Sequence, residues 1–364
     1  MFLVNPSQPI LDTIPLEPLR LTQRTKASGC GCKMPPAQLK AMLEGLERTT
    51  HPQVLVGFEH ADDAAALRLP GTNQLLLSTA DFFSPVVDNP YDFGRVAAAN
   101  ALSDIYAMGG RPCLALGLLA WPVDDLGLAS AAEVMRGAQD LCIEEGVPLA
   151  GGHSIIATEP FFGLAVQGLV AEEHLKTNRG ALDGDVLYLT KPLGSGIMAA
   201  ALRKGLLDTP DYYGLLEQLS VVNRVGATLA LLPEVHAMTD LTGFGLLGHG
   251  LEMLEPPLGL DLWTDRVPLL VGLEHYLQQR ILPDQCYRNW QHVENRVQGV
   301  QGEDFAWLCD PQTNGGLLVA VDPDASVKME AVLESAGVRW ACIGRFTEEH
   351  EGIRCSKAVP SAST

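Results

Sequence analysis

Short apolar runs alternate with helical segments from about residue 51 onward. Two helices are predicted in the first half, Phe93–Met108 ending at a Gly-Gly pair and Ser130–Glu145 ending at Gly146. The strand-like runs between them are Val54–Gly57, Gln74–Thr79, Pro112–Leu119, Val147–Ala150 and Phe161–Val170. The alternation predicts one α/β domain over residues 51–178.

A polar, turn-rich stretch at Asn178–Asp185 is the predicted domain boundary. The strands expected beyond it are Val186–Thr190, Val235–Thr239, Gly316–Val321 and Arg339–Ile343. The helices expected there are Gly196–Lys204, Leu216–Leu231, one from Phe244 and Ala325–Ala336. This pattern predicts a second domain, of the α+β or α/β class, over residues 185–350.

The two ends of the chain have a different composition. Residues 1–20 hold four prolines and are predicted to form an extended arm, and residues 356–364 a flexible tail. Residues 21–50, with a Gly/Cys/Lys motif, are predicted to form a mobile segment. The start of the chain lacks the basic and apolar regions of a signal peptide, so we expect a cytoplasmic protein.

Charge and hydrophobicity exclude two classes of protein. The 364 residues carry 25 Lys and Arg against 44 Asp and Glu, a formal charge of −19. Nucleic-acid affinity depends on Lys and Arg that neutralise phosphates, so we expect no nucleic-acid partner. Apolar runs fall short of the roughly 20 residues that cross a bilayer, so we expect no membrane span.

Most of the eight cysteines lie in apolar runs typical of a reduced protein core, but Cys30 and Cys32 lie in Ser28–Lys33. Glycines beside Cys30 predict an exposed backbone, and Lys33 would lower the pKa of the thiol and favour the nucleophilic thiolate. Lys33 could instead hold a phosphate. Met34 after Lys33 excludes a Walker A loop, and the chain offers no partner pair for a zinc ribbon. A flexible loop with incidental thiols is the alternative.

Acidic residues near predicted strand ends could supply oxygen ligands to Mg²⁺. Asp62 and Asp63 follow the first strand and Asp81 the second, although such residues commonly serve as turn or helix-cap residues. Asn100 and Asp104 are four apart and share one face of the first helix. An Asp buried among apolar residues needs a partner or a metal ion, which favours a functional role for Asp104 about as much as a structural one.

Two glycine motifs could bind anions. Gly151-Gly152-His153-Ser154 follows a short strand and could form an anion-binding nest, or simply a tight turn. The run Gly243–Gly248 matches G-x-G-x-x-G between a predicted strand and a helix. A dinucleotide site is disfavoured there because no strand with a terminal acid follows at the expected distance, and because Asp240 precedes the glycines.

Seven motifs occur in order between about Leu21 and Arg345. They are Gly29–Lys33, His60–Ala64, Thr79–Phe83, Asn100–Asp104, Ala150–Ser154, Met238–Gly245 and Asp310–Gly316. Together they closely resemble those of the selenophosphate synthetase family. The resemblance implies Mg²⁺-dependent conversion of ATP, selenide and water to selenophosphate, AMP and orthophosphate. It also implies the two-domain fold of aminoimidazole ribonucleotide synthetase, α/β plus α+β, with N-terminal domains that pair into a β-barrel across a homodimer.

The resemblance also implies roles for individual residues. Cys30 falls on the family's catalytic cysteine or selenocysteine position, and Lys33 on its essential lysine. The metal-binding aspartates would be Asp63, Asp104 and Asp240. The nucleotide-contact positions would be Lys33, His60, Ala61, Asp62, Asp81, Asp104, Gly152, His153 and Ser154.

Two positions depart from the family pattern. His60-Ala61 stands where a Thr-Arg-like pair is common, so only backbone roles carry over there, and Asn314 stands where Ser is usual. The alternatives are another ATP-dependent kinase or synthetase of the same superfamily, and a non-catalytic protein that binds selenium or thiols.

Overall fold

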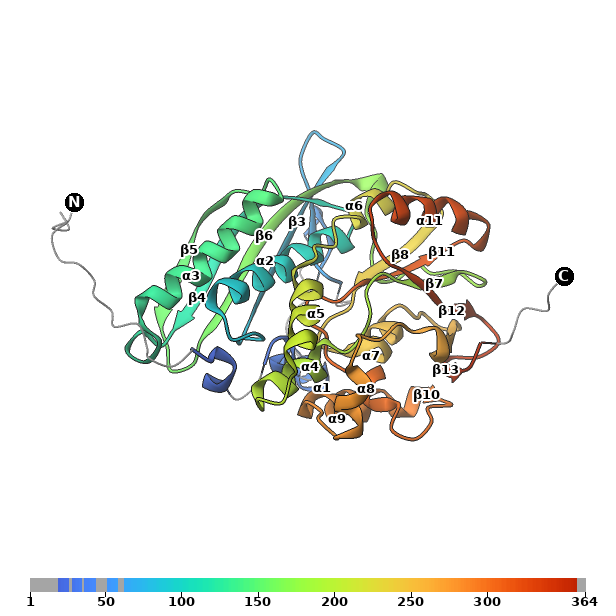
Figure 1. Ribbon diagram of the computed structural model, residues 1–364. Helices are drawn as coiled ribbons and strands as arrows, with labels where there is room; N and C mark the ends of the chain where they lie inside the picture. The colour runs from blue at the N-terminus through green and yellow to red at the C-terminus, as the bar shows by residue number, and fades with distance from the viewer. Residues whose placement is uncertain (1–18, 26–27, 35, 44–50, 58–61, 359–364) are drawn as a thin grey trace.

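The computed structural model describes residues 19–25, 28–34, 36–43, 51–57 and 62–358 (Figure 1). The N-terminal unit is built on a six-stranded sheet in which only β4 and β5 run parallel. In spatial order its strands are β1 (Val54–Val56), β2 (Ala65–Arg68), β3 (Gln74–Phe83), β6 (Phe161–Ala171), β4 (Arg111–Trp121) and β5 (Leu149–Ile156). β5 therefore forms one edge of the sheet.

Two helices cover one face of this sheet, α2 (Pro90–Ala107) over β3 and β6, and α3 (Val123–Glu144) over β4 and β5 (Figure 1). The side chain of Asn89 accepts a hydrogen bond from the amide of Asp92 and so caps α2. α2 and α3 lie very close together, since a Cβ on Gly137 would lie 1.9 Å from the backbone oxygen of Tyr91. The polar side chains in the C-terminal half of α2 are buried elsewhere, because Asn100 and Asp104 hydrogen-bond residues of β3 and Ser103 hydrogen-bonds Asn223 of the C-terminal unit.

Among the residues that the structure describes, no helix covers the other face of the six-stranded sheet (Figure 1). Strand pairing places Leu118 beside His153, and Ala120 beside Ile155, on this face. The side chains of Phe82 and Ile155 are 56% and 54% exposed. The central strands thus present apolar residues to solvent in the single chain.

The predicted strands of the first half are confirmed, with three corrections. Gly151–Ser154 is not a turn, because it pairs with β4 and lies within β5. β3 continues through Asp81 to Phe83, so Asp81 is not at a strand end. α3 begins at Val123, before the predicted Ser130, and Gly127 with φ of 74° interrupts its first turn.

The C-terminal unit holds a seven-stranded mixed sheet. Its strands in spatial order are β10 (Val297–Gln298), β13 (Gly352–Ser356), β9 (Gly259–Trp263), β12 (Ala341–Thr347), β7 (Val186–Leu189), β11 (Leu317–Val321) and β8 (Val235–Asp240). Its helices are α4 (Ser195–Arg203), α5 (Thr209–Ser220), α6 (Gly226–Leu229), α7 (Gly245–Glu252), α8 (Leu273–Gln278), α9 (Asp284–Val293), α10 (Phe305–Leu308) and α11 (Ser326–Ser335). Apolar side chains of α6 and α11 pack with those of β7, β8 and β11.

The remaining described helices are short. They are α1 (Pro36–Leu43) and the 3-10 turns Leu21–Arg24, Cys30–Cys32, Glu172–His174, Thr264–Arg266, Glu294–Arg296 and Pro323–Ala325. None of the helices in the described part of the chain is long and apolar enough to span a bilayer.

The four strands predicted in the second half are confirmed, but the helix predicted at Leu216–Leu231 is wrong. α5 ends at Ser220 and α6 begins only at Gly226. The carbonyls of Leu219 and Val221 accept hydrogen bonds from the side chain of Asn314, which lies far along the chain. These hydrogen bonds from a distant residue interrupt the predicted helix. β9 was not predicted, and β13 lies beyond residue 350, where the predicted domain ends.

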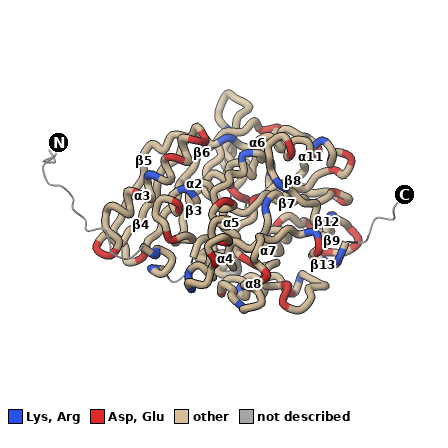
Figure 2. Tube along the Cα trace, viewed as in Figure 1, with Lys and Arg blue, Asp and Glu red and all other residues tan. Residues whose placement is uncertain are grey.

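The two units share an interface around the C-terminal half of α2. α2 contacts both α5 and β8. A Cβ on Gly226 would lie 2.3 Å from the backbone oxygen of Tyr106, so α6 meets the end of α2. One continuous apolar core runs through both units. Asp and Glu are interspersed with Lys and Arg over much of the trace (Figure 2).

Candidate active site

The Gly-Cys-Gly-Cys-Lys segment is docked between the two units. The amide of Gly29 donates to the backbone oxygen of Ser84 at 3.0 Å, just past β3. The amide of Cys30 donates to Oγ1 of Thr313 at 3.0 Å, in the C-terminal unit. Gly29 has φ of 53°, and a Cβ there would lie 2.3 Å from the same Oγ1. A glycine is therefore needed for the segment to dock.

The Cys30 thiol is buried at this junction. Its side chain is fully buried, and Sγ donates to Oδ1 of Asn100 at 3.4 Å. Burial raises the pKa of the Cys30 thiol well above its ordinary value, although the Lys33 charge opposes this shift. The lowered thiol pKa expected from Lys33 is therefore wrong for this conformation, because desolvation outweighs the nearby cation. Burial also raises the pKa of Cys32.

Lys33 faces a group of carboxylates. Its Nζ lies 3.6 Å from Oδ1 of Asp81 on β3. Burial disfavours the charge of Lys33, but Asp81, Asp104 and Asp240 raise its pKa well above the ordinary value, so the ammonium stays charged. A Cβ on Gly243 would lie 3.1 Å from Cδ of Lys33 and 2.7 Å from the backbone oxygen of Cys30. The second glycine motif thus packs directly against the segment Gly29–Lys33.

The three predicted metal-binding aspartates come from three parts of the fold and influence one another. Asp104 is on α2, Asp240 ends β8 and Asp63 precedes β2. Burial, followed by repulsion from Asp240, raises the pKa of Asp63 and of Asp104 well above the ordinary value. Burial raises the pKa of Asp240 as well. Each carboxyl has a hydroxyl partner, but Oδ2 of Asp63 and of Asp240 is buried without a hydrogen-bond partner.

Buried, mutually repelling carboxylates with unpartnered oxygens suit a hard divalent cation such as Mg²⁺, which prefers oxygen ligands. In the described part of the chain, no three His, Cys, Asp or Glu side chains converge closely enough to hold a metal ion by themselves. The aspartates therefore offer only part of a coordination sphere. A bound polyphosphate and water could supply the remaining oxygens.

Asn100 joins the parts of the site, although the sequence prediction did not include it among the site residues. Its Nδ2 donates a hydrogen bond to Oδ2 of Asp81. Its Oδ1 accepts one hydrogen bond from the Cys30 thiol and another, of 2.7 Å, from the backbone amide of Asn314. Ser103, three residues on, hydrogen-bonds Asp240. The signal that could have identified Asn100 was its place on the Asp104 face of an alanine-rich helix.

The remaining predicted nucleotide positions do not all join this cluster. Oδ1 of Asp62 accepts the amide of Asn178 at 3.0 Å. His60 and Ala61 lie outside the described residues. Gly152-His153-Ser154 lies on β5, three strands from β3 and so roughly 14 Å across the sheet. The single chain does not bring these residues to Asp81 and Cys30.

Known proteins share this sequence and architecture. Residues 61–170 match the family AIR synthase related protein, N-terminal domain, and residues 183–355 match its C-terminal domain. The chain is 45% identical to a selenide, water dikinase of Pseudomonas putida, over 91% of the chain and 97% of that protein. It is 46% identical to one of Colwellia psychrerythraea, over 90% of the chain and 96% of that protein.

Solved structures show the same fold at lower identity. A thiamine-monophosphate kinase from Stenotrophomonas maltophilia is 23% identical and aligns with a TM-score of 0.60, over 89% of this chain and 96% of its own. AaThiL in complex with AMPPCP and TMP aligns with a TM-score of 0.62 at 18% identity, over 89% of this chain and 93% of its own. These likenesses confirm the two-domain fold.

Proposed function

The chain belongs to the selenide, water dikinase family of AIR synthase related proteins, and from this membership we infer that it converts ATP, selenide and water to selenophosphate, AMP and orthophosphate. One observation carries the assignment to this site: Cys30 and Lys33 are docked beside carboxylates that come from both units. We propose that this junction is the active site, and that the protein works in the cytoplasm.

We propose that Asp63, Asp104 and Asp240 hold Mg²⁺ together with the phosphates of ATP. Mg²⁺ neutralises phosphate charge and so favours attack on phosphorus. The unpartnered oxygens of Asp63 and Asp240 are the observation that supports this assignment. Threonine hydroxyls orient two of the carboxylates. Oγ1 of Thr79 donates to Oδ2 of Asp104 at 2.6 Å, and Oγ1 of Thr239 donates to Oδ1 of Asp63 at 3.0 Å.

Lys33 would stabilise the transferring phosphoryl group. Phosphoryl transfer needs little covalent work from the protein and depends mainly on positioning and on charge stabilisation. The neighbouring carboxylates keep Lys33 protonated, and Asp81 holds its ammonium on the side of the cluster. Lys33 therefore enters the reaction as a fixed positive charge.

Cys30 would hold hydrogen selenide beside the transferring phosphoryl group through a hydrogen bond from Se–H to its sulfur, without a covalent bond to selenium, so that no oxidant is needed. In the docked conformation the thiol is protonated and donates to Asn100, so it is protected from side reactions. To act as a thiolate it must leave this buried position, and the flanking Gly29 and Gly31 allow such a movement of the segment. We propose that the docked conformation alternates with an open one in which Cys30 binds hydrogen selenide noncovalently.

The nucleotide site would be completed by a second copy of the chain. Gly152, His153 and Ser154 lie far from Asp81 within one chain, on an edge strand of a sheet with one uncovered apolar face. Pairing of two such sheets into a barrel would bury this face. It would also allow β5 of the partner subunit to approach the nucleotide.

This arrangement predicts that the protein is a dimer and that Ile155→Glu makes it monomeric, because a charge without a partner in the buried barrel costs several kcal/mol. Light scattering coupled to size exclusion measures the mass. Ile143→Glu is the matched control, since Ile143 is 67% exposed on α3, away from the uncovered face. A monomeric wild-type protein, or a dimeric Ile155→Glu variant, would contradict the dimer.

Phosphorus NMR of ATP, selenide and Mg²⁺ with the protein tests the function. AMP, orthophosphate and selenophosphate in equal amounts are expected. Production of ADP would indicate a kinase of the same superfamily instead, and unchanged ATP a non-catalytic binding protein.

The same assay tests Cys30. We expect Cys30→Ser to lower selenide-dependent AMP formation by about a hundredfold, because a hydroxyl remains protonated and is a poor selenium carrier. Cys113→Ser, at an exposed free cysteine, is the matched control and should keep full activity. Full activity of Cys30→Ser would refute the selenium-carrier role.

A further inference from the structure

The geometry points to Asn314 as a positioning residue that sets the place of the Cys30 thiol by tying the catalytic segment to the linker between α5 and α6, residues 221–225. This inference rests on the proposed function only in taking Cys30 as the selenium carrier. Asn314 is fully buried. It donates its hydrogen bonds to Asn100, Leu219 and Val221 and not to the carboxylates. It would act through other residues.

The backbone of Asn314 is in the left-handed region, with φ of 46°. Among residues other than glycine, Asn adopts this region comparatively readily. In this conformation its amide donates to Oδ1 of Asn100 at 2.7 Å, and its carbonyl accepts Nζ of Lys191 at 2.9 Å. The unusual backbone thus serves two hydrogen bonds at once.

The side chain of Asn314 anchors the linker. Its Nδ2 donates to the carbonyls of Leu219 and Val221 at 2.7 and 2.8 Å, and Lys191 also donates to Val221. A serine has one hydroxyl hydrogen and could not donate to both carbonyls. The amide therefore holds the end of α5 in a way that smaller polar residues cannot reproduce.

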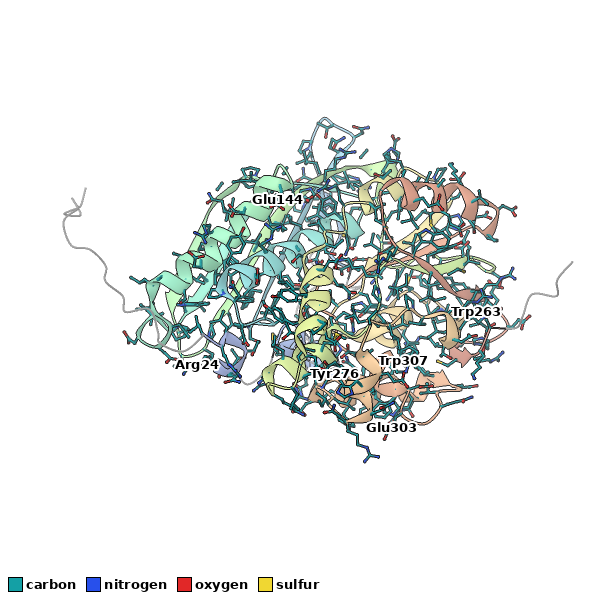
Figure 3. All side chains as sticks on the ribbon, in the orientation of Figure 1. Arg24, Glu144, Trp263, Tyr276, Glu303 and Trp307 are labelled. Carbon is teal, nitrogen blue, oxygen red and sulfur yellow. The ribbon has the colours of Figure 1, made fainter. Side chains whose placement is uncertain are left out.

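The linker needs hydrogen bonds because packing holds it only in part. Val221 is 46% exposed, and it lines a cleft of about 980 Å³ together with Lys191 and Glu144. Glu144, at the end of α3, is labelled in Figure 3. Segments that border open space lack the close contacts that immobilise a core. Asn314 and Lys191 supply fixed attachment points in their place.

The other end of the network reaches Cys30 from two sides. Oδ1 of Asn100 accepts both the Asn314 amide and the Cys30 thiol, so Asn314 helps to fix the acceptor of that thiol. Thr313, its neighbour in the chain, accepts the amide of Cys30 at 3.0 Å. A shift of Asn314 would therefore release the thiol from its buried position.

Alkylation of Cys30 by iodoacetamide at fixed pH tests this role. We expect Asn314→Ala to react about tenfold faster than wild type, because it loses the side-chain anchor and disfavours the left-handed backbone. Asn314→Gly should react at an intermediate rate, because glycine keeps the backbone conformation and loses only the anchor. Fragment-ion mass spectrometry separates Cys30 from Cys32.

Gln218→Leu is the matched control. Gln218 is also buried, near the end of α5, and its Nε2 donates to the carbonyl of Pro192 at 2.8 Å and not to Asn314. We expect its alkylation rate to stay within about twofold of wild type, and the Asn314 variants to lose kcat with an unchanged KM for ATP.

Three outcomes would overturn the inference: alkylation of folded Asn314 variants at the wild-type rate, an equal increase in Gln218→Leu, or a changed KM for ATP with no change in alkylation. If Asn314→Ala does not fold, Asn314→Gly decides. A wild-type protein that makes no selenophosphate would refute the proposed function, whereas the alkylation rates would still test the positioning of the thiol.

Discussion

Replacing Asp240 by Asn is expected to lower selenophosphate formation by about a thousandfold, the upper range for loss of one preorganised charge-stabilising group. Asp240 is 1% exposed, its Oδ2 has no hydrogen-bond partner, and it lies near Asp63 and Asp104. An amide of the same shape removes the negative charge that would hold Mg²⁺. The NH₂ group that replaces one oxygen would also repel the cation.

The same substitution should not unfold the protein. Without Mg²⁺, repulsion from Asp240 is a cause of the raised pKa of both Asp63 and Asp104, so removing that charge relieves strain in the metal-free fold. We therefore expect the metal-free variant to melt at or above the wild-type temperature while its activity is lost. A loss of activity without a loss of thermal stability distinguishes a carboxylate that binds the metal ion from one that only stabilises the fold.

Product formation by phosphorus NMR across a Mg²⁺ titration, with thermal melts in EDTA, measures both effects. Asp284→Asn is the matched control, because Asp284 is an exposed residue in the first turn of α9. It should keep wild-type activity. An Asp240→Asn enzyme with unchanged Mg²⁺ dependence would show that Asp240 is not a ligand.

Removal of divalent cations is expected to weaken ATP binding by about a hundredfold or more, since neutralisation of phosphate charge by a bound metal ion is worth several kcal/mol. The chain has a formal charge of −19, and the site itself gathers buried carboxylates. ATP is a polyanion, so the field of the protein repels it. The single charge of Lys33 faces three carboxylates, those of Asp81, Asp104 and Asp240, and cannot reverse the local charge.

Isothermal titration with ATP in Mg²⁺ and in EDTA measures this difference. Ionic strength must be matched between the two buffers, because salt screens the repulsion by itself. Binding should return when Mg²⁺ is added in excess of EDTA. Tight binding of ATP in EDTA would contradict the cation bridge and would direct attention to Lys33 and the backbone amides as the phosphate-binding groups.

Local patterns were sufficient for much of the fold. The strands Gln74–Thr79, Phe161–Val170 and Val235–Thr239 are confirmed, because alternating or continuous apolar positions reflect which faces of a strand are buried. Failures occurred where distant residues override the local pattern. β5 runs through Gly151-Gly152 because β4 pairs with it. The helix predicted from Leu216 to Leu231 is interrupted where the side chain of Asn314 donates hydrogen bonds to two backbone carbonyls.

The sequence by itself determined the family, the two domains and the types of residue in the site, because motif spacing and the chemistry of Cys, Lys and Asp are local properties. Only the tertiary structure decided the state of those residues. The amide of Cys30 donates a hydrogen bond to Thr313, 283 residues away, and the side chain of Asn100 accepts one from the amide of Asn314, 214 residues away. Burial at this junction, which local sequence does not encode, makes Cys30 a protected thiol and leaves the aspartate oxygens without partners.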